Sequence, residues 1–188
     1  MSHDLEIEKT IQLPGNLRPH GLRQYKENWV VVSSYEDCIV GFDNQGVELF
    51  RYEFSDKRKY YGSAQHHCND ICIVGDYAYV SMFSVTGNWK RGSFDGGIIE
   101  VNLANGSMRT VKNNLTMPHS IDFKNKGFSI LNSFKGEILQ NNFDIFGVLP
   151  GFVRGYDENA KYMFVGESKN RNFSRLDTGR TPVTVDRK

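Results

Sequence analysis

Met117-Pro118-His119-Ser120-Ile121 recurs, with changes, at three other places in this 188-residue chain. The other copies are Arg18-Pro19-His20-Gly21-Leu22, His67-Cys68-Asn69-Asp70-Ile71 and Phe152-Val153-Arg154-Gly155-Tyr156. Aligned on their third residue, the copies are 49, 50 and 35 residues apart, from 69 − 20, 119 − 69 and 154 − 119. A period of about 40–50 residues that is filled with strands is typical of a β-propeller.

The same succession of short β-rich runs follows each of the first three copies. These runs cover residues 29–32, 38–42 and 47–52, then 77–82, 97–101 and 108–111, then 128–131, 137–139 and 146–149. The breaks between them are rich in Asn, Asp and Gly, and Asn105-Gly106 predicts a two-residue hairpin turn because both positions tolerate positive φ. No segment has a long helical period. We therefore expect an all-β chain of four-stranded antiparallel blades.

The fourth copy is shorter than the others. It contains one further β-rich run, at 162–166, and the residues from Glu167 to Lys188 are polar and basic. We expect a single β-propeller domain with blades at about 16–54, 66–112, 116–149 and 152–188, the last incomplete. Since closed propellers have about four to eight blades, about three and a half blades predict the N-terminal part of a larger propeller. The alternative is a small closed four-bladed ring.

An incomplete propeller has consequences for assembly and order. An unpaired blade edge invites self-association or pairing with a partner chain. We also expect residues beyond about Arg175 to be poorly anchored.

Charge and hydropathy exclude several classes of partner. The chain has 23 Lys+Arg and 22 Asp+Glu, a net charge of +1, and the two signs are interspersed. This balance argues against nucleic acid or an anionic membrane as the partner. No apolar run approaches the roughly 18 residues that span a bilayer, and Met1-Ser2-His3-Asp4 does not begin a secretory signal. These features predict a soluble, cytoplasmic protein.

The three cysteines, Cys38, Cys68 and Cys72, are odd in number, which disfavours a complete disulfide framework. Cys68 and Cys72 would share one face of a strand, about 13 Å apart, too far for joint tetrahedral ligation of zinc. We expect packing cysteines and no metal ligand set among them.

Polar residues at the strand starts carry the functional argument. The first strand of each propeller blade lines the central channel, so His20, Asn69, His119 and Arg154 would form part of a ring at one mouth. Asp70 and His67 would lie nearby. Imidazole and amide groups can coordinate a cation, hydrogen-bond a sugar or carboxylate, or shuttle a proton. The alternative is that these groups only hold water or cap backbone groups.

A second layer of candidates follows the second strands. Residues 33–35, 81–84, 132–135 and 167–171 fall at equivalent places and mix small polar side chains with aromatic ones. The ligand-binding candidates here are Asn132, Glu167, Ser168, Lys169 and Arg171. Aromatic faces beside hydroxyl and amide groups suit a sugar-sized ligand. The insertion 86–95 would be a lid that carries Trp89 over the mouth, or a surface loop whose Trp packs on a neighbouring blade.

A family resemblance rests on Leu149-Pro150-Gly151-Phe152-Val153-Arg154-Gly155, on 165–171, and on 117–120 and 131–137. These stretches resemble a bacterial propeller family described only as a domain of unknown function (DUF4915), over roughly residues 16–175. The resemblance implies the propeller fold and supports the positions His119, Arg154, Ser168, Lys169 and Arg171. Members are usually longer and continue into further blades. The family supplies no established reaction.

A more distant resemblance concerns the Pro-His-x-hydrophobic openings. They are similar to those of streptogramin lyase and the gluconolactonase-like propellers, which use a divalent cation in the channel. This likeness implies that Asn69, Asp70, Asn132 and Glu167 would be the candidate ligands for such a cation. The cofactor stays open at this point.

Three functions remain. The first is a module that binds a carbohydrate or other small polar ligand at the channel mouth, favoured because no Gly-x-Ser-x-Gly nucleophile motif is present. The second is a lyase, lactonase or hydrolase, with His119 as general base and Arg154 stabilising negative charge. The third is a protein-interaction scaffold. Fold alone does not choose among them.

Overall fold

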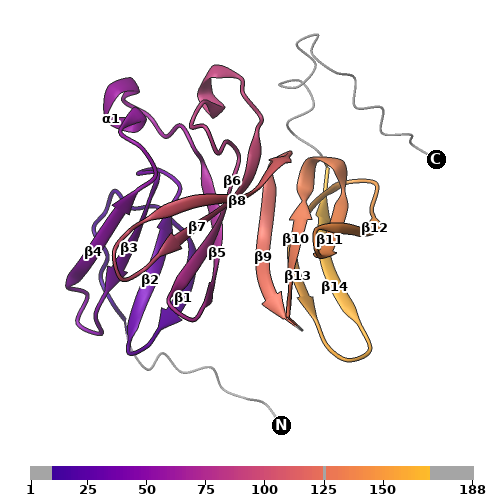
Figure 1. Cartoon of the computed structure of the whole chain (residues 1–188), viewed down its shortest axis with the longest axis horizontal. Coiled ribbons are helices and arrows are strands. Elements are labelled where there is room, and N and C mark those ends of the chain that lie inside the picture. The colour runs from indigo at the N-terminus through magenta and orange to yellow at the C-terminus, as the bar shows by residue number, and fades with distance from the viewer. Residues whose placement is uncertain (1–9, 125, 170–188) are drawn as a thin grey trace.

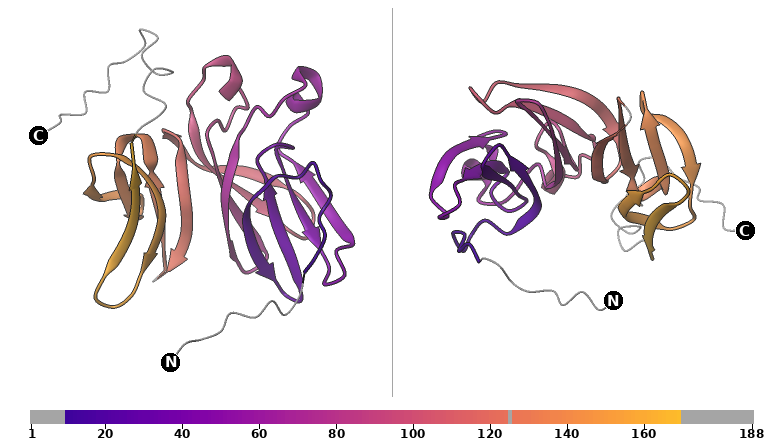
Figure 2. Two further views of the ribbon diagram at one scale, coloured as in Figure 1. Left: turned by 180° about the vertical axis from the view of Figure 1, so that it is seen from behind. Right: turned by 90° about the horizontal axis from the view of Figure 1, so that it is seen from below.

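A computed structural model describes residues 10–124 and 126–169, which form four antiparallel sheets arranged along an open arc (Figures 1 and 2). Three sheets have four strands and the last has two, each in simple sequential order. The first strands of successive sheets lie next to one another. The chain is therefore an all-β propeller, and its described residues form three four-stranded blades and a two-stranded one.

The strand bounds follow the sequence repeat. The first blade has β1 (Pro19–Tyr25), β2 (Asn28–Ser33), β3 (Cys38–Phe42) and β4 (Glu48–Glu53). The second has β5 (Cys68–Val74), β6 (Tyr77–Met82), β7 (Gly96–Asn102) and β8 (Met108–Leu115). The third has β9 (Pro118–Lys124), β10 (Gly127–Asn132), β11 (Glu137–Asn141) and β12 (Asp144–Val148). The fourth has β13 (Phe152–Glu158) and β14 (Met163–Ser168).

Strand pairing confirms the alignment of the four copies. The second position of each copy pairs across the blade with the equivalent residue of the second strand. These pairs are Pro19 with Ser33, Cys68 with Met82, Pro118 with Asn132 and Val153 with Glu167. Because this pairing recurs in all four sheets, the second residues of the copies occupy equivalent places, and the third residues follow directly after them.

The prediction of a two-residue hairpin turn at Asn105-Gly106 is wrong in its length. β7 ends at Asn102 and β8 begins at Met108, so five residues, 103–107, make the connection. Only Gly106 has a positive φ, of 75°. The Asn102 amide instead donates to the Ser107 carbonyl oxygen at 2.9 Å and closes a longer loop.

Among residues 10–124 and 126–169, three short helical turns lie in connections between strands, and none is expected from the sequence. They are α1 (Lys57–Tyr61) and the 3-10 turns η1 (Trp89–Arg91) and η2 (Ser133–Lys135). α1 and the loop that contains η1 rise at the same end of the blades (Figure 1). β5 and β9 also start at this end, so the loops stand beside the strand starts.

Apolar side chains from facing blades form the core. Val30, Val32 and Ile39 of the first blade pack with Ala78 and Val80 of the second. Fully burying one such side chain stabilises the fold by about 1.5–3 kcal/mol. Similar clusters join the second blade to the third and the third to the fourth. Each blade is therefore fixed by its neighbours.

Cys38, Cys68 and Cys72 are buried and unpaired. The expectation that Cys68 and Cys72 share a face is wrong, because the pairing of β5 with β6 shifts between Cys68 and Asp70. This bulge reverses the alternation, so Cys68 packs between the first and second blades and Cys72 between the second and third. Burial raises the pKa of the Cys72 thiol to about 12.

Some expectations fall beyond the described residues. The predictions for residues 170–188, including the site candidate Arg171, lie outside residues 10–124 and 126–169. Within those ranges, no helix is long and apolar enough to cross a bilayer.

Candidate functional site

The backbone at the strand starts repeats from blade to blade. The first position of the sequence pattern has a positive φ in three copies: 44° at Arg18, 52° at His67 and 54° at Met117. Positive φ is uncommon for residues other than glycine. Its recurrence at one aligned position shows that the three strands are entered by the same local turn.

The pairing register shifts in each of the four first strands, which marks a bulge. Pairing skips His20 in β1 and Asn69 in β5, and it skips Gly155 in β13. In β9 the shift in pairing register lies between His119 and Asp122. Bulges redirect side chains and are common beside functional sites. The polar residues that the alignment selected therefore lie at or next to these irregularities.

Side chains from all four blades meet at this end in one continuous set, the mouth cluster, which comprises His20, His67, Phe83, Trp89, His119, Phe152 and Arg154. The ring centroids of His67 and Phe83 are 4.4 Å apart, and those of Phe83 and His119 are 5.3 Å apart. His119 lies 5.5 Å from Phe152, and the guanidinium carbon of Arg154 lies 5.6 Å from the centroid of the Phe152 ring. The contacts thus run from the second blade to the fourth.

The cluster also extends to the first blade and to the η1 loop. The His20 ring is edge-on to His67, with centroids 6.0 Å apart, and the Trp89 ring lies 4.3 Å from His67. Phe83 and Phe152 are buried, whereas His20 and Arg154 are exposed. The arrangement is an apolar aromatic floor with polar groups around it.

Hydrogen bonds fix the tautomer of His119. Its Nδ1 lies 2.9 Å from the Met117 carbonyl oxygen, which can only accept, so Nδ1 carries the proton. The Ser133 Oγ is also 2.9 Å from Nδ1, and this hydroxyl donates to the Leu131 carbonyl oxygen at 3.4 Å. Nε2 is therefore the unprotonated nitrogen. It has no hydrogen-bond partner within the part of the chain that the structure describes.

The His119 imidazole is neutral near pH 7. Burial lowers its pKa to about 4, and the positive charges of Arg154 and His20 act in the same direction. The titration near neutral pH that is usual for an exposed histidine is not expected here. His119 instead offers the Nε2 lone pair as a hydrogen-bond acceptor.

Arg154 supplies the complementary group. Its side chain is exposed and makes no ion pair with a carboxylate of residues 10–124 or 126–169. The stacking on Phe152 limits where the guanidinium can lie. A planar donor set without a carboxylate partner is suited to binding an anion by paired hydrogen bonds.

Two predicted ligand residues are already engaged in holding the fold. Asn69 is buried and donates from Nδ2 to the carbonyl oxygens of His67 and Pro118, at 3.3 and 3.2 Å. Asn132 is also buried. It accepts from the Thr116 amide at 2.6 Å and donates to the Glu137 carboxylate at 2.6 Å.

Asp70 lies at the contact of the first two blades, outside the mouth cluster. One of its oxygens accepts from the Ile71 amide at 2.8 Å and lies 3.9 Å from the Arg23 guanidinium. Burial raises its pKa. A Cβ on Gly21 would lie 3.0 Å from the same oxygen, so little room is left there.

The end of β14 borders the mouth cluster. Ser168 donates from its hydroxyl to the carbonyl oxygen of Phe152 at 3.5 Å. Glu167 and Lys169 are exposed beside it. These three residues flank the cluster at its fourth-blade side without a described contact to His119.

A divalent cation does not fit the four oxygen donors that the distant resemblance implied. The side-chain oxygen of Asn69 has no hydrogen-bond partner among the described residues, but both ends of the Asn132 amide are in use, and an Asp70 oxygen already accepts from the Ile71 amide. Among the described residues, no three His, Cys, Asp or Glu side chains group in a way that could hold a metal ion. We derive no chemistry through a cation.

Asp37 holds the backbone segment that leads into the mouth cluster. It was not among the residues selected from the sequence. Its buried carboxylate accepts hydrogen bonds from three consecutive backbone amides, those of Gln65, His66 and His67. These bonds hold the segment that places His67 in the mouth cluster. The partners are about 30 residues away along the chain, so no local pattern signals the role.

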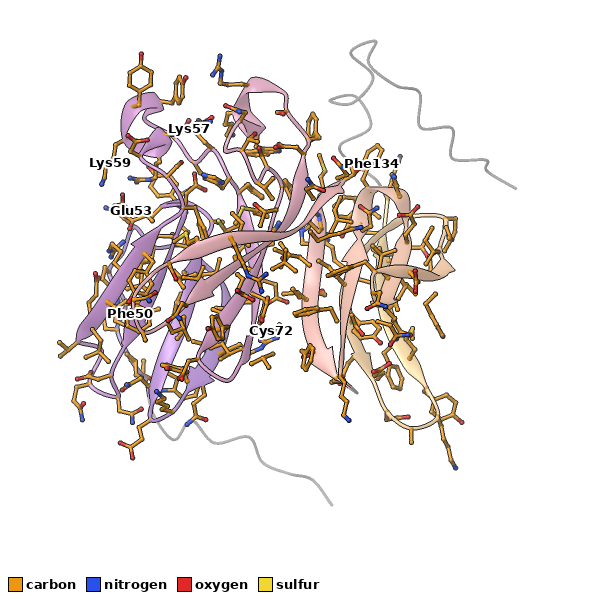
Figure 3. All side chains as sticks on the ribbon, viewed as in Figure 1. Phe50, Glu53, Lys57, Lys59, Cys72 and Phe134 are labelled. Atoms are coloured by element: carbon orange, nitrogen blue, oxygen red, sulfur yellow. The ribbon has the colours of Figure 1, made fainter. Side chains whose placement is uncertain are left out.

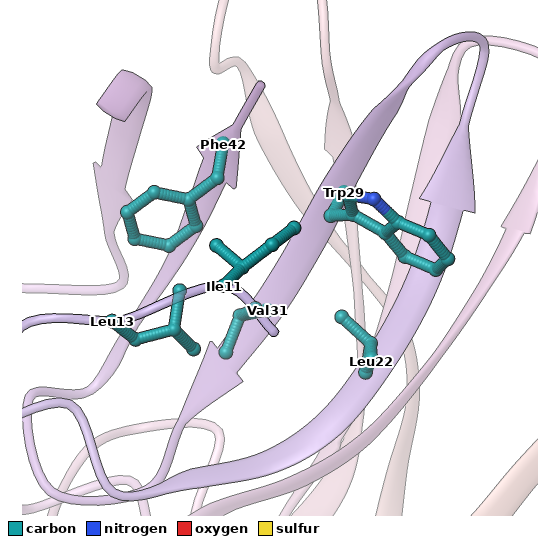
Figure 4. Close-up of a pocket in the computed structure, with 6 residues that line it drawn as sticks. All are labelled: Ile11, Leu13, Leu22, Trp29, Val31 and Phe42. Atoms are coloured by element: carbon teal, nitrogen blue, oxygen red, sulfur yellow. The ribbon is translucent and has the colours of Figure 1, made fainter. Parts of the chain in front are cut away.

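An apolar pocket on the face of the first blade that does not pack against the second blade is a separate feature. Figure 4 shows its lining residues, Ile11, Leu13, Leu22, Trp29, Val31 and Phe42. The single polar group, Nε1 of Trp29, already donates to the Asn44 side chain at 3.0 Å. Because it offers no further directional contact, we do not assign a polar ligand to it.

Comparison with known proteins establishes the family. The model of the family described as Domain of unknown function (DUF4915) matches residues 2–184, so the chain belongs to this family. No curated protein sequence matches the chain.

Comparison of structures supports the fold. The computationally designed Ika4 protein has a TM-score of 0.56 at 10% identity, covering 86% of this chain and 93% of its own. The computationally designed Ika8 protein has a TM-score of 0.54 at 10% identity, covering 79% of this chain. The chain spans only 42% of the Ika8 chain. At these identities the likeness shows the propeller fold alone.

A lyase is also among the solved structures that match this chain. Virginiamycin B lyase from Staphylococcus aureus matches with a TM-score of 0.47 at 12% identity, covering 81% of this chain and 66% of its own. A match at this level carries no information about chemistry in this chain.

Proposed function

We propose that the mouth cluster binds a small polar ligand that carries both a carboxylate and a hydroxyl group, such as a sugar acid. The supporting observation concerns two groups that have no such partner among the described residues: Nε2 of His119, an acceptor without a donor, and the guanidinium of Arg154, which has no carboxylate. Both groups adjoin the Phe152 ring.

The chemistry of the two groups selects the ligand class. A neutral imidazole nitrogen accepts a hydrogen bond, so its partner has to be a donor such as a hydroxyl. A guanidinium only donates, and its fork matches the two oxygens of a carboxylate. The packed rings of the cluster, which include His67 and Trp89, then offer apolar surface to the apolar side of a sugar ring.

The enzymatic alternative has weaker support. A general base works best when its pKa is near the operating pH, and the pKa of His119 is about 4. Nucleophilic attack would also need an activated side chain. The Ser133 hydroxyl contacts Nδ1, the protonated nitrogen of His119, and so receives no base there.

The scaffold alternative rests on exposed apolar side chains on the outer strands. Ile145, Phe146 and Val148 of β12 and Phe164 of β14 are more than half exposed. These side chains provide apolar surface that a partner protein could cover, but they do not indicate which partner it would be.

Isothermal titration calorimetry against a panel tests the proposal. The panel is D-galacturonate, D-glucuronate, D-glucose and acetate. We expect the two uronates to bind more tightly than glucose or acetate, which each lack one of the two groups. Replacing Arg154→Lys should weaken uronate binding by about tenfold, because the charge is kept and the fork is lost.

The matched control is Arg109→Lys. Arg109 makes a comparable forked contact, to Glu100, but on the outer part of the second blade. This substitution should leave uronate affinity unchanged. Equal binding of all four compounds, or equal loss in both variants, would refute the proposal.

A further inference from the structure

Positive charge is concentrated in two loops beside the mouth. Residues 56–61 and 88–92 contain Lys57, Arg58, Lys59, Lys90 and Arg91 against a single carboxylate, Asp56, which gives 5 − 1 = +4. The whole chain has a net charge of only +1. The two loops therefore differ in charge from the rest of the molecule.

The two loops are joined to each other. The Lys57 ammonium donates to the Thr86 carbonyl oxygen at 2.5 Å and to the Asn88 side chain at 3.1 Å. The Arg91 guanidinium donates to the Tyr61 hydroxyl at 3.0 Å. Loops from two blades therefore form one surface, on which Figure 3 shows Lys57 and Lys59.

We call this surface the basic platform and define it by Lys59, Tyr60, Tyr61, Lys90 and Arg91. Tyr60 is 82% exposed, with its ring edge-on to Tyr61 at 4.7 Å. Lys90 and Arg91 make no ion pair with any carboxylate of residues 10–124 and 126–169. Lys59 pairs with Glu53 at 2.6 Å, but both are exposed, so the pair is weak.

The platform is continuous with the mouth cluster. The Lys90 ammonium lies 4.3 Å from the centroid of the Trp89 ring, and that ring lies 4.3 Å from His67. A ligand that occupied the cluster and extended past Trp89 would therefore lie directly on the platform.

We infer that the basic platform extends the mouth cluster into a binding site for an acidic oligosaccharide, an inference that rests on the proposed function. One uronate unit would occupy the cluster, and the following units would contact the platform. Tyr60 offers a face for the sugar ring, and Arg91 and Lys90 offer partners for carboxylates.

Nucleic acid is the other polyanion with which such a surface could be confused. Binding along a phosphate backbone draws on many basic contacts over a broad face. Here the cations without a carboxylate partner among the described residues are few, and the chain outside the two loops has 18 Lys+Arg against 21 Asp+Glu, a net charge of −3. The observations favour the oligosaccharide.

Calorimetry with acidic sugars of different length tests this inference. The probes are galacturonate and mannuronate, each as monomer and trimer. We expect at least one trimer to bind about tenfold more tightly than its monomer, through added charge-assisted hydrogen bonds. Arg91→Gln and Tyr60→Ala should reduce trimer affinity toward that of the monomer and leave monomer affinity unchanged.

Matched controls lie at the opposite end of the blades, in the connection between β13 and β14. Lys161→Gln removes one exposed positive charge, and Tyr162→Ala removes one exposed tyrosine. Neither should change trimer affinity. A melting curve for each variant checks that it is folded.

The outcomes separate the two proposals. Equal affinity of trimers and monomers, or trimer binding insensitive to Arg91→Gln and Tyr60→Ala, would overturn the platform. The platform proposal would also be overturned if a 12-nucleotide oligo-dT bound more tightly than either trimer at the same salt concentration. It would likewise be overturned if neither trimer bound. Trimer binding that depends on Arg91 but not on Arg154, without monomer binding, would overturn the mouth-cluster proposal alone.

Discussion

Asn69 donates a hydrogen bond from its side-chain nitrogen to the carbonyl oxygen of Pro118, 3.2 Å away, and so links the first strands of the second and third blades. The same nitrogen donates to the carbonyl oxygen of His67 at 3.3 Å. In the sequence alignment, Asn69 occupies the position that His20 and His119 occupy in the neighbouring blades. Its side-chain nitrogen, however, donates only to backbone carbonyl oxygens. Its role is to hold the two strand starts together.

Replacing Asn69→Ala should lower the free energy of unfolding by about 1–2 kcal/mol, because two carbonyl oxygens lose a buried donor. The loss is moderated because the Asn69 side-chain oxygen is itself buried without a partner among the described residues. Urea denaturation measures the change. Asn142→Ala, at an exposed turn, is the control and should change stability little. An Asn69→Ala variant as stable as the parent would show that the link is unimportant.

Acidification should destabilise the fold through His119. Its pKa is about 4 in the folded state and 6.5 ordinarily, so between these values the unfolded chain binds more protons. The free energy of unfolding therefore rises with pH across this window and falls by up to about 3 kcal/mol as pH drops from 6.5 to 4. His119→Gln should flatten this part of the stability profile. Parallel profiles for the two proteins would contradict the assignment.

Gly136→Ala should destabilise the third blade and disturb the mouth cluster. Gly136 ends η2 with a φ of 69°, and a Cβ there would overlap the carbonyl oxygen of Leu149. We expect a loss of about 2–4 kcal/mol, from backbone strain and steric overlap together. Thermal or urea unfolding measures it. Gly15→Ala is the control, since a Cβ at Gly15 meets nothing within 4 Å, and equal stability of the two variants would refute this reading.

Asp37→Ala should remove the anchor of the segment that carries His67. Three backbone amides lose a charged acceptor, and we expect a loss of about 2–4 kcal/mol of stability. Asp56→Ala removes an aspartate that makes no side-chain cap to α1 and should be close to neutral. Hydrogen exchange of the His66 and His67 amides is the direct readout. Unchanged protection in Asp37→Ala would be inconsistent with the anchor.

The strands and their register could be predicted from the sequence because they depend on local signals. The β-rich run 29–32 became β2 (Asn28–Ser33), and turn residues marked where such runs end. The repeat then aligned the blades, and the common pairing register confirmed that alignment.

The short helix α1 could not be predicted in this way. Lys57–Tyr61 has no buried residue and no apolar face, so it has no periodic pattern. The bonds of Lys57 to Thr86 and Asn88 contribute to fixing it, and these partners lie 29 and 31 residues away. The bulge that separates the faces of Cys68 and Cys72 likewise appears only in the pairing.

For the candidate site, the repeat pointed to His20, His119 and Arg154, whose side chains lie in the mouth cluster, but not to what each one does. His119 and Asn69 occupy equivalent positions in the repeat, yet the His119 ring belongs to the mouth cluster, whereas the Asn69 side chain is buried and donates to two backbone carbonyl oxygens. The difference arises from partners that are distant in sequence. The low pKa of His119 similarly depends on burial beside Phe83 and Phe152, from two other blades.

The most direct measurement is an NMR titration of isotope-labelled protein with D-galacturonate, observing histidine ring and arginine side-chain signals. We predict saturable shifts at His119 and Arg154, with smaller shifts at Trp89 and none at Lys161. In Arg154→Lys the same shifts should require about tenfold more ligand, as expected when a forked contact becomes a single charge. Saturable shifts that leave out His119 and Arg154, or no saturable shifts at all, would contradict ligand binding at the mouth cluster.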